Sequence, residues 1–514
     1  MSKKEYTGHP DARRPSGHIM PWVHLALLIV IVIALNFIGC REYGRRDLSN
    51  DERYTISQRT VNVLTSRRVQ ERDTPITIIF AFKRSTPGYS RMRHLLEDYE
   101  RFSLGKVKVE CFDPIREPNR AREISRIYNV DFNQNLCVVD ARKNPNVALN
   151  TFEKEQSNNE RKHVRIRPGT SFVRYESVLD KVRGEEIRRP VALMMDDVVC
   201  GALTEAVEGD LRRMYVVDGK GGISRDNPDL LETIGNITNS LNIQLTWANI
   251  ADVDSLPEDA EGVIVIGPQV DFTEAEVNVL REFWERSGRK SIFVALDPAH
   301  TDLPLFYRFL REQGIHPNRD RVLLRDRSRA YYDISAVFPK GLQCTRVFWN
   351  TTTHVEGECM SLRLEHWDEN LANLRHLTLY PLIKTTAEYY GETRADLKPV
   401  FDKREDHEGP LCIEAAVTRG NAKDPNNLNT LVVLGNISTL EKDNIRSEQR
   451  DYLSSVFAWM SNRPEYAGKS AKVDLTTKID LNRHTQSALE HITLWIMPLL
   501  ALLIALVIWN TRRH

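Results

Sequence analysis

Two long apolar stretches, one near each end of the chain, interrupt an otherwise mixed pattern of hydrophobic and polar positions. They run from Pro21 to Gly39 and from Ile492 to Trp509, and neither contains Asp, Glu, Lys or Arg. A helix of roughly 20 residues crosses the ~30 Å hydrocarbon core of a bilayer. The pattern therefore predicts a membrane-spanning helix over residues 21–39, a second one over residues 492–509, and a water-soluble body between them.

Charged residues flank both stretches and leave their orientation open. Arg13 and Arg14 precede the first stretch, and Arg45 and Arg46 follow it. Cytoplasmic loops are normally enriched in Lys and Arg, so a balanced distribution selects neither side. Two spans nevertheless place both chain termini on one side of the membrane and the body on the other.

The segments next to the two stretches are polar and carry little periodicity. We expect a polar tail over residues 1–20, a stalk over 40–72, a connector over 465–491 and a basic tail over 510–514. The sequence Phe37-Ile38-Gly39-Cys40 resembles a lipoprotein cleavage site, so lipidation at Cys40 is an alternative to an uncleaved anchor. The apolar run is longer than the roughly 7–15 residues of a signal-peptide core, which favours the anchor.

Between residues 73 and 190 the hydrophobic pattern alternates between strand and helix periods. In chain order it predicts a strand, a helix, a strand, a helix ending at Tyr128 and a strand, the others lying over residues 76–82, 89–102, 106–112 and 135–140. Weaker strands are expected near Val164 and Phe172. The order β-α-β-α-β indicates a small α/β domain that contains parallel pairing.

A second α/β region is expected over residues 191–464. Its predicted elements include a helix over 202–213, a strand over 214–217, and buried strands over 262–268 and 291–296. Thr273 and Glu276 have the spacing of a capping box, which places a helix start there. The alternation predicts a doubly wound sheet, with the irregular, partly β residues 321–410 as an insertion.

The composition excludes some functional classes. The 514 residues include 71 Lys and Arg and 71 Asp and Glu, so no net charge favours binding to nucleic acid. The seven cysteines are scattered and none has C-x-x-C spacing, which argues against a zinc site or a dense disulfide framework. A disulfide between Cys344 and Cys359 is an alternative if this region lies outside the cytoplasm.

A glycine-rich turn is the main candidate for ligand binding. Asp218-Gly219-Lys220-Gly221-Gly222 follows a predicted strand and precedes a helix, where a backbone can cradle an anion. In doubly wound sheets ligands bind at the carboxyl ends of the strands. The residues that would meet there are Asp218, Gly221, Gly267 with Pro268, and Asp297. A plain turn is the alternative, since the sequence lacks the complete phosphate-binding motifs.

Two other groups of residues carry side chains used in catalysis or metal binding. One contains metal-ligand types: His354, Glu356, Glu358, Cys359 and, further on, His366. Alternation along an exposed strand gives the same pattern. The other, Asp196-Asp197, fits a loop or helix start better than a paired acid and base. The sequence also lacks a Walker A loop for ATP hydrolysis and a G-x-S-x-G nucleophile elbow. Taken with the two groups above, this leads us to expect no metal, no cofactor and no enzymatic activity.

Several short sequence segments, together with their order along the chain, resemble the GldG-like auxiliary proteins of ABC-2-type transporters, a family associated with gliding motility. They lie at residues 54–60, 89–99, 108–114, 202–206, 263–268, 296–298 and 431–436 and precede the terminal apolar stretch. The family's Gly-His-Gly-Glu-like turn is here Gly219-Lys220-Gly221-Gly222. Residues 321–410 match the family poorly.

The resemblance implies two extracytoplasmic α/β domains, the first thioredoxin-like and the second like flavodoxin or a glutamine amidotransferase. It also implies both termini in the cytoplasm, the body outside the inner membrane, and partners consisting of an ABC-2-type permease and a separate ATPase. We therefore predict a non-catalytic accessory subunit that binds a substrate or an envelope ligand. The alternatives are a membrane-tethered envelope hydrolase that uses the strand-end pocket, and a purely structural tether.

Overall fold

The protein was analysed as a computed structural model that describes residues 24–25, 27–34, 55–149, 160–179, 186–225, 228–325, 333–366, 368–394, 399–421, 424–441, 444–468, 473–474 and 498. The chain divides into one unit over Met1–Asn50 and another over Asp51–His514, each of which is considered by itself.

In the first unit, the described residues 24, 25 and 27–34 are helical. Leu25 and the seven apolar side chains from Leu27 to Ile33 are between 47% and 63% exposed. Within the described residues, no helix has both the length and the apolar character needed to cross a bilayer. Residues 21–23, 26 and 35–39 of the first predicted span, and all of the second except Pro498, lie outside the described residues.

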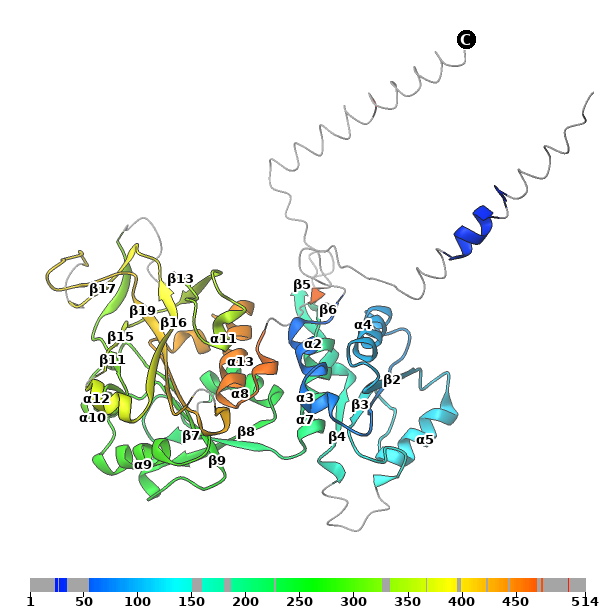
Figure 1. Cartoon of the computed structure of the whole chain (residues 1–514), viewed down its shortest axis with the longest axis horizontal. Helices are drawn as coiled ribbons and strands as arrows, with labels where there is room; N and C mark the ends of the chain where they lie inside the picture. The colour runs from blue at the N-terminus through cyan, green and yellow to red at the C-terminus, as the bar shows by residue number, and fades with distance from the viewer. Residues whose placement is uncertain are drawn as a thin grey trace, which may run out of the picture. The chain divides into compact units, whose positions relative to one another are not determined.

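The second unit has a mixed α/β fold with several sheets (Figure 1). Its first elements are α2 (Gln58–Leu64), α3 (Arg67–Gln70), β1 (Ile76–Ala81), α4 (Tyr89–Phe102), β2 (Val107–Phe112), α5 (Pro118–Tyr128), β3 (Leu136–Asp140), β4 (Val164–Pro168), β5 (Val173–Leu179), β6 (Glu186–Leu193) and α7 (Met195–Glu208). The predicted elements over residues 76–140 are therefore confirmed, with boundaries that agree within a few residues.

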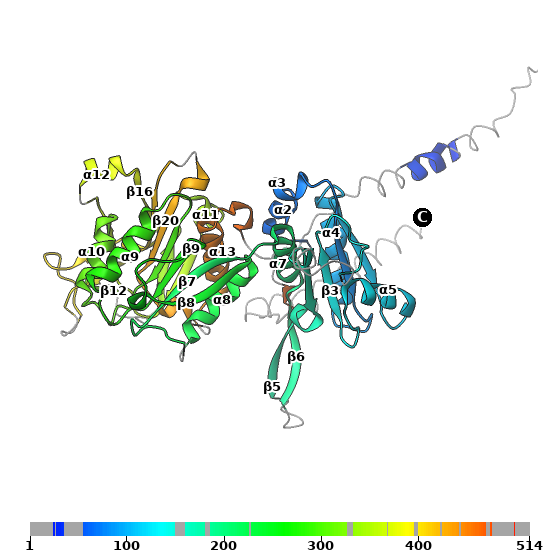
Figure 2. The same cartoon turned by 90° about the horizontal axis from the view of Figure 1, so that it is seen from below.

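The first sheet has the strand order β2-β1-β3-β4. β1 pairs in parallel with β2, whereas β3 is antiparallel to both β1 and β4. Successive side chains of a strand point to opposite faces. Ile78 and Phe80 accordingly share a core with α4 and α7, while Ile79 and Ala81 share another with α5. β5 and β6 form a separate hairpin, drawn as two adjacent arrows in Figure 2.

The helix expected over residues 202–213 is shifted in the structure. α7 already begins at Met195, with Asp196 and Asp197 in its first turn, where carboxylates complement the helix dipole. It ends before Gly209, whose φ of +74° is incompatible with continued helix. Arg212 and Arg213 belong instead to the next strand. The interpretation of Asp196-Asp197 as a helix start is confirmed.

The remaining elements are β7 (Arg212–Asp218), α8 (Asp229–Ser240), β8 (Ile243–Asn249), β9 (Ala260–Ile266), α9 (Glu274–Glu285), β10 (Ser291–Ala295), α10 (Pro304–Glu312), β11 (Ile315–Pro317), β12 (Arg321–Leu324), β13 (Asp333–Val337), α11 (Gln343–Arg346), β14 (Thr352–Glu356), β15 (Leu362–Leu364), α12 (Glu369–Leu374), β16 (Leu377–Thr385), β17 (Tyr389–Glu392), β18 (His407–Glu408), β19 (Cys412–Arg419), β20 (Asn429–Leu434), α13 (Ser447–Met460) and β21 (Val473–Asp474).

A nine-stranded sheet organises this part of the chain. Its order is β14-β13-β16-β19-β20-β10-β9-β7-β8, and the five strands from β20 to β8 are parallel. α8 and α13 share a core with one face, and α9 and α10 share a core with the other. The capping box of Thr273 and Glu276 is present at the start of α9, as predicted.

Residues 321–410 are joined to this sheet. β13, β14 and β16 extend it beyond β19 through antiparallel pairs, while β12, β17 and β18 form a small sheet of their own. The insertion is therefore partly β, as expected, and three of its strands continue the main sheet.

A buried carboxylate lies between this sheet and α13. Glu414, on β19, is 2% exposed, and its Oε2 accepts a hydrogen bond from the hydroxyl of Tyr452 at 2.7 Å. Burial raises the pKa of Glu414 to about 7, although the hydrogen bond from Tyr452 opposes this shift. Between pH 4.5 and 7, the folded chain therefore binds more protons at this residue than the unfolded chain does.

Glu414→Gln should remove this pH dependence. Ionisation of Glu414 makes the wild type less stable as the pH rises through this window, whereas a glutamine does not titrate. The unfolding free energy of the variant, relative to wild type, should rise by up to about 3 kcal/mol between pH ~4.5 and pH ~8. Denaturant titrations across this range measure it, and a constant difference would contradict the assignment.

Candidate functional site

The four residues predicted as a ligand site all lie at the carboxyl edge of the parallel strands. Asp218 ends β7, Gly221 follows in the next loop, Gly267 follows β9, and Asp297 lies two residues beyond β10. The parallel strands run in the order β8-β7-β9-β10-β20, so the chain order reverses between β7 and β9. Ligands of doubly wound sheets bind at such a switch point.

The loop after β7 occupies this switch point. The carbonyl of Lys220 accepts the backbone N–H of Gln269 at 2.8 Å and that of Val270 at 3.1 Å. A Cβ on Gly222 would lie only 1.9 Å from the carbonyl oxygen of Gly267. The two loops are thus in direct backbone contact, and the glycine is required by this approach.

The side chain of Lys220 points inward. Its Nζ lies 2.6 Å from Oε2 of Glu276 and 4.7 Å from the ring centre of Phe272. Burial raises the pKa of Glu276, but hydrogen bonds from Lys220 and Thr273 outweigh it and lower the pKa below its ordinary value. Lys220 therefore attaches the loop to the start of α9.

The two predicted aspartates have local partners. Asp218 accepts the backbone N–H of Gly219 at 2.8 Å and forms an ion pair with Arg225 at 3.5 Å. Asp297 accepts the backbone N–H of Ala299 at 2.9 Å and lies 2.7 Å from Nδ1 of His300. The structure thus gathers the four residues at one edge, where the described contacts are local.

The residues with metal-ligand side chains are distributed among different partners. His354 lies 2.9 Å from Asp333, Glu356 lies 2.7 Å from Arg446, and Glu358 lies 3.6 Å from Arg321. Cys344 and Cys359 are both buried free thiols. In the part of the chain that the structure describes, no three potential ligands gather into a metal site.

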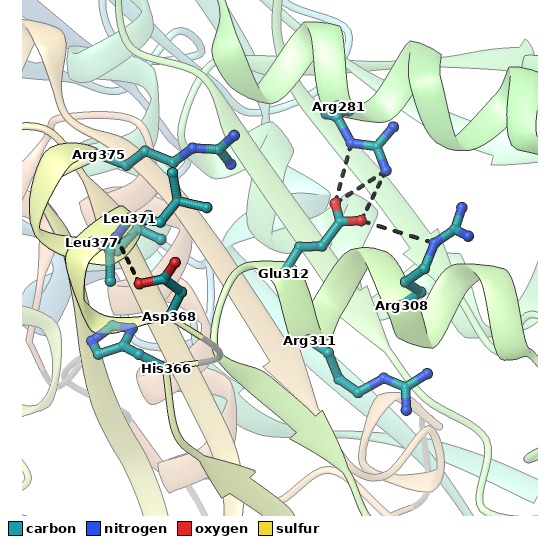
Figure 3. Close-up of a pocket in the computed structure, with 10 residues that line it drawn as sticks. Arg281, Arg308, Arg311, Glu312, His366, Asp368, Leu371, Arg375 and Leu377 are labelled. Carbon is teal, nitrogen blue, oxygen red and sulfur yellow. Dashed lines mark hydrogen bonds and ion pairs between the residues drawn. The ribbon is translucent and has the colours of Figure 1, made fainter.

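A cavity of about 560 Å³ lies elsewhere, between α9, α10 and α12 (Figure 3). Its polar lining consists of Arg281, Arg308, Arg311, Glu312, His366, Asp368 and Arg375. Leu371, Ala372 and Leu377 supply apolar surface. The lining contains four arginines and two carboxylates, so it carries a formal charge of +2 before His366 is counted. We refer to it as the arginine cavity.

The amphipathic patterns of α9 and α10 place three of these arginines outside the core. On α10, Phe306, Phe309 and Leu310 enter the core, which leaves Arg308 and Arg311 on the other side of the helix. On α9, Leu280 and Phe283 are buried in the same way, and Arg281 lies outside the core. The two amphipathic helices pack on one sheet face and so bring their arginines together.

Glu312 neutralises part of this charge. Arg281 donates to it through Nε and Nη2, with distances of 3.0–3.1 Å, and Arg308 lies 3.9 Å away (Figure 3). Arg308 also pairs with Glu274. Arg375 has a longer ion pair of 3.5 Å with Glu285, and Arg311 donates Nε to the carbonyl of Tyr307 at 3.3 Å. Arg311 and Arg375 are therefore the arginines with the weakest described ties to carboxylates.

The arginine cavity lies toward the amino-terminal edge of the parallel strands. Leu377 begins β16 and pairs with Arg419 at the end of β19, which in turn pairs with Asn429 at the start of β20. The ligand site predicted from the sequence lies at the opposite edge. The only sequence signal for the cavity was a pair of arginines three residues apart on α10, which is common on exposed helix faces.

A family model described as a domain of unknown function (DUF7088) matches residues 50–168, and no curated protein matches the chain. The N-terminal domain of mmIFT52 is similar at 15% identity with a TM-score of 0.35, covering 48% of this chain and 97% of that chain.

Two bacterial structures are also similar. The first, an exo-β-1,4-mannosidase from an Opitutaceae bacterium, has 11% identity and a TM-score of 0.25, covering 51% of this chain and 37% of that chain. The second, a ThuA-like protein from Parabacteroides merdae, has 10% identity and a TM-score of 0.29, covering 49% and 91%. At these TM-scores, the similarities assign neither fold nor function.

Gly222→Ala should destabilise the protein, because its Cβ would overlap the carbonyl of Gly267. A loss of about 1–3 kcal/mol in unfolding free energy is expected. The control is Gly235→Ala inside α8, where an added Cβ meets nothing within 4 Å. It should leave the stability unchanged or raise it by about 0.5–1 kcal/mol. Denaturant unfolding measures both, and equal effects would contradict the loop contact.

Proposed function

We propose that this protein is a membrane-anchored, non-catalytic accessory subunit that binds an anionic ligand in the arginine cavity. The observation that carries the proposal is the presence of four arginines, from three segments, in the lining of one cavity of about 560 Å³. Ligand pockets commonly have volumes of roughly 300–1,000 Å³. Guanidinium groups bind carboxylates and phosphates through paired hydrogen bonds, so the ligand class is a di- or polyanion.

Membrane attachment is proposed from the ends of the chain. Both terminal apolar stretches have the length and composition of spans. The exposed apolar side chains of Leu25 and of residues 27–33 support an apolar environment for the first stretch, since water is a poor solvent for such a surface. We propose the bacterial inner membrane, with both termini in the cytoplasm and the body outside it.

The strand orders support the finer fold assignment. The first sheet has the order β2-β1-β3-β4, and α7 covers its antiparallel strands β3 and β4. This arrangement fits a thioredoxin-like domain that has no redox cysteine pair. The parallel order β8-β7-β9-β10-β20 corresponds to the 2-1-3-4-5 order of flavodoxin-like sheets. Both domains are those that the resemblance to GldG-like proteins implies.

That resemblance suggests the partners, an ABC-2-type permease and a separate ATPase. The accessory subunit would then present an anionic substrate or envelope ligand to the permease. A strand-end hydrolase is the weaker alternative, because the loop after β7 occupies the crevice such an enzyme would use. A purely structural tether would have no use for a cavity lined by arginines.

Removing the charge of Arg311 or Arg375 should weaken anion binding. Arg311→Met and Arg375→Met keep most of the apolar side-chain stem, and each is expected to reduce the affinity for pyrophosphate or citrate about tenfold or more. Isothermal titration calorimetry on the full chain in detergent measures the binding. Higher salt should weaken it further.

Arg126→Met provides the matched control, since Arg126 lies on the exposed side of α5. It should bind both probes like the wild type. Failure of the wild type to bind either anion, or equal loss in the control, would contradict the arginine cavity as the site.

Membrane partners are tested separately by purification of the tagged full chain in mild detergent. We expect an ABC-2-type permease and a Walker A-containing ATPase to be recovered with it and identified by mass spectrometry. Repeated recovery of the chain without either protein would refute the transport-complex assignment while leaving anion binding intact.

A further inference from the structure

A second cavity, also of about 560 Å³, lies beside β15, β16 and β19. Its lining is Asn318, Ser361, Leu362, Arg363, Leu364, Leu379, Pro381, Lys384, His407, Pro410, Leu411 and Cys412. None of these residues lines the arginine cavity. Leu364 lines this cavity and His366, two residues further on, lines the arginine cavity, so the two cavities are neighbours.

The lining combines an apolar wall with cationic groups. Six leucine and proline residues line it, while Arg363, Lys384 and the ionisable His407 are its basic members. It contains no carboxylate, in contrast to the arginine cavity, where Glu312 and Asp368 offset the positive charge. An occupant therefore meets a hydrophobic surface and a positive field together.

A β-bulge directs Lys384 to this cavity. Leu379 and Pro381 line it from one face of β16, and strict alternation would place Ile383 beside them. The register of β16 against β19 shifts around Ile383, which instead packs in the core on the other face. The bulge brings Lys384 opposite Cys412, and both side chains line the cavity.

A buried aspartate holds His407 in place. Nδ1 of His407 lies 2.7 Å from Oδ2 of Asp320, whose side chain is fully buried. Asp320 also accepts the hydroxyl of Ser361 at 2.6 Å and the backbone N–H of Ser361 at 2.8 Å. Gly391 packs so tightly on Asp320 that a Cβ there would lie 2.0 Å from Oδ2.

This arrangement fixes the chemistry of the imidazole. Because Nδ1–H donates to Asp320, Nε2 is the nitrogen that remains for an occupant, and the ring becomes a second donor when it is protonated. The hydrogen bond to Asp320 raises the pKa of His407, although burial opposes it. The charged groups around the ring are Asp320, Arg363 and Asp406, and Arg363 is also 3.2 Å from Glu365.

Lys384 strengthens the positive field because the described residues include no ion-pair partner for it within 4.0 Å. A lysine at the edge of an apolar wall attracts a negative head group and packs its stem against a hydrocarbon chain. His407 and Arg363 supply further donors for the oxygens of that head group.

We propose that this second cavity binds a single-chain amphiphilic anion, with a carboxylate or phosphate head at Lys384 and His407 and an apolar chain along the leucine and proline wall. This goes beyond the function proposed above, because the ligand class and the lining both differ from those of the arginine cavity. The charge complementarity of a wall without carboxylates selects an anion over an uncharged or cationic amphiphile.

Decanoate and decyl phosphate are suitable probes. Calorimetry on the full chain should detect binding of one or both, while decanol and decyltrimethylammonium, which lack a negative head, should bind at least about tenfold more weakly. Acetate, which lacks the chain, should also bind more weakly. Equal binding of decanol and decanoate, or no binding of either anionic probe, would overturn the proposal.

Lys384→Met tests the head-group contact, since methionine keeps an apolar stem without the charge. It should weaken decanoate binding about tenfold, whereas Lys340→Met, a control beside Trp349, should not. Arg311→Met should also leave decanoate binding unchanged, which separates this cavity from the arginine cavity. Loss of binding in either control would contradict the assignment.

His407→Gln tests the imidazole, because an amide can still donate to Asp320 but cannot gain a proton. Protonation of His407 adds positive charge, so decanoate should bind wild type more tightly below the raised pKa of His407 and more weakly as the pH rises through it. The variant should lose this pH dependence while its thermal unfolding stays cooperative. A variant with the wild-type pH profile would refute the role of His407.

Discussion

Both cavities depend on the antiparallel pairing of β16 with β19. A parallel sheet is normally extended through crossover connections, but β19 runs antiparallel to β20 and pairs with β16, which in turn pairs with β13. Leu377 of β16 lines the arginine cavity, and Leu379 and Pro381 line the second one. A slip of one residue would turn these side chains to the opposite face. The register of β16 against β19 therefore determines which side chains of β16 line each cavity.

Charge is distributed locally in a chain that has no net charge. Helix amphipathicity collects arginines above one part of the sheet, where Glu312 holds Arg281 and Arg308 in a defined geometry. Around β15 and β18, a single buried aspartate orients Ser361 and His407. Asp320 lies behind the second cavity's lining, so its negative charge positions donors without occupying the cavity itself. The two neighbouring sites thus have different electrostatic character although they share a strand.

The strand order of the sheet creates a switch point at which a ligand could bind, but in this chain the loop after β7 occupies that position. The reversal between β7 and β9 creates the position at which related sheets bind ligands. Here the glycines of the loop after β7 allow backbone contact with Gly267, and Lys220 anchors the loop at Glu276. Glycines at such a turn are compatible with both a phosphate cradle and close loop packing. Only the three-dimensional contacts distinguish the two.

The sequence by itself determined the α/β class, most elements of both sheets and the helix start at Thr273, because hydrophobic period and capping depend on nearby residues. It also placed Asp218, Gly221, Gly267 and Asp297 at one edge, since strand ends follow from strand order. The tertiary structure decided which cavities exist. Arg281 and Arg375 are far apart in sequence, and Lys384 faces its cavity only because a bulge shifts the register of β16. Such contacts depend on long-range packing, for which a local pattern carries no signal.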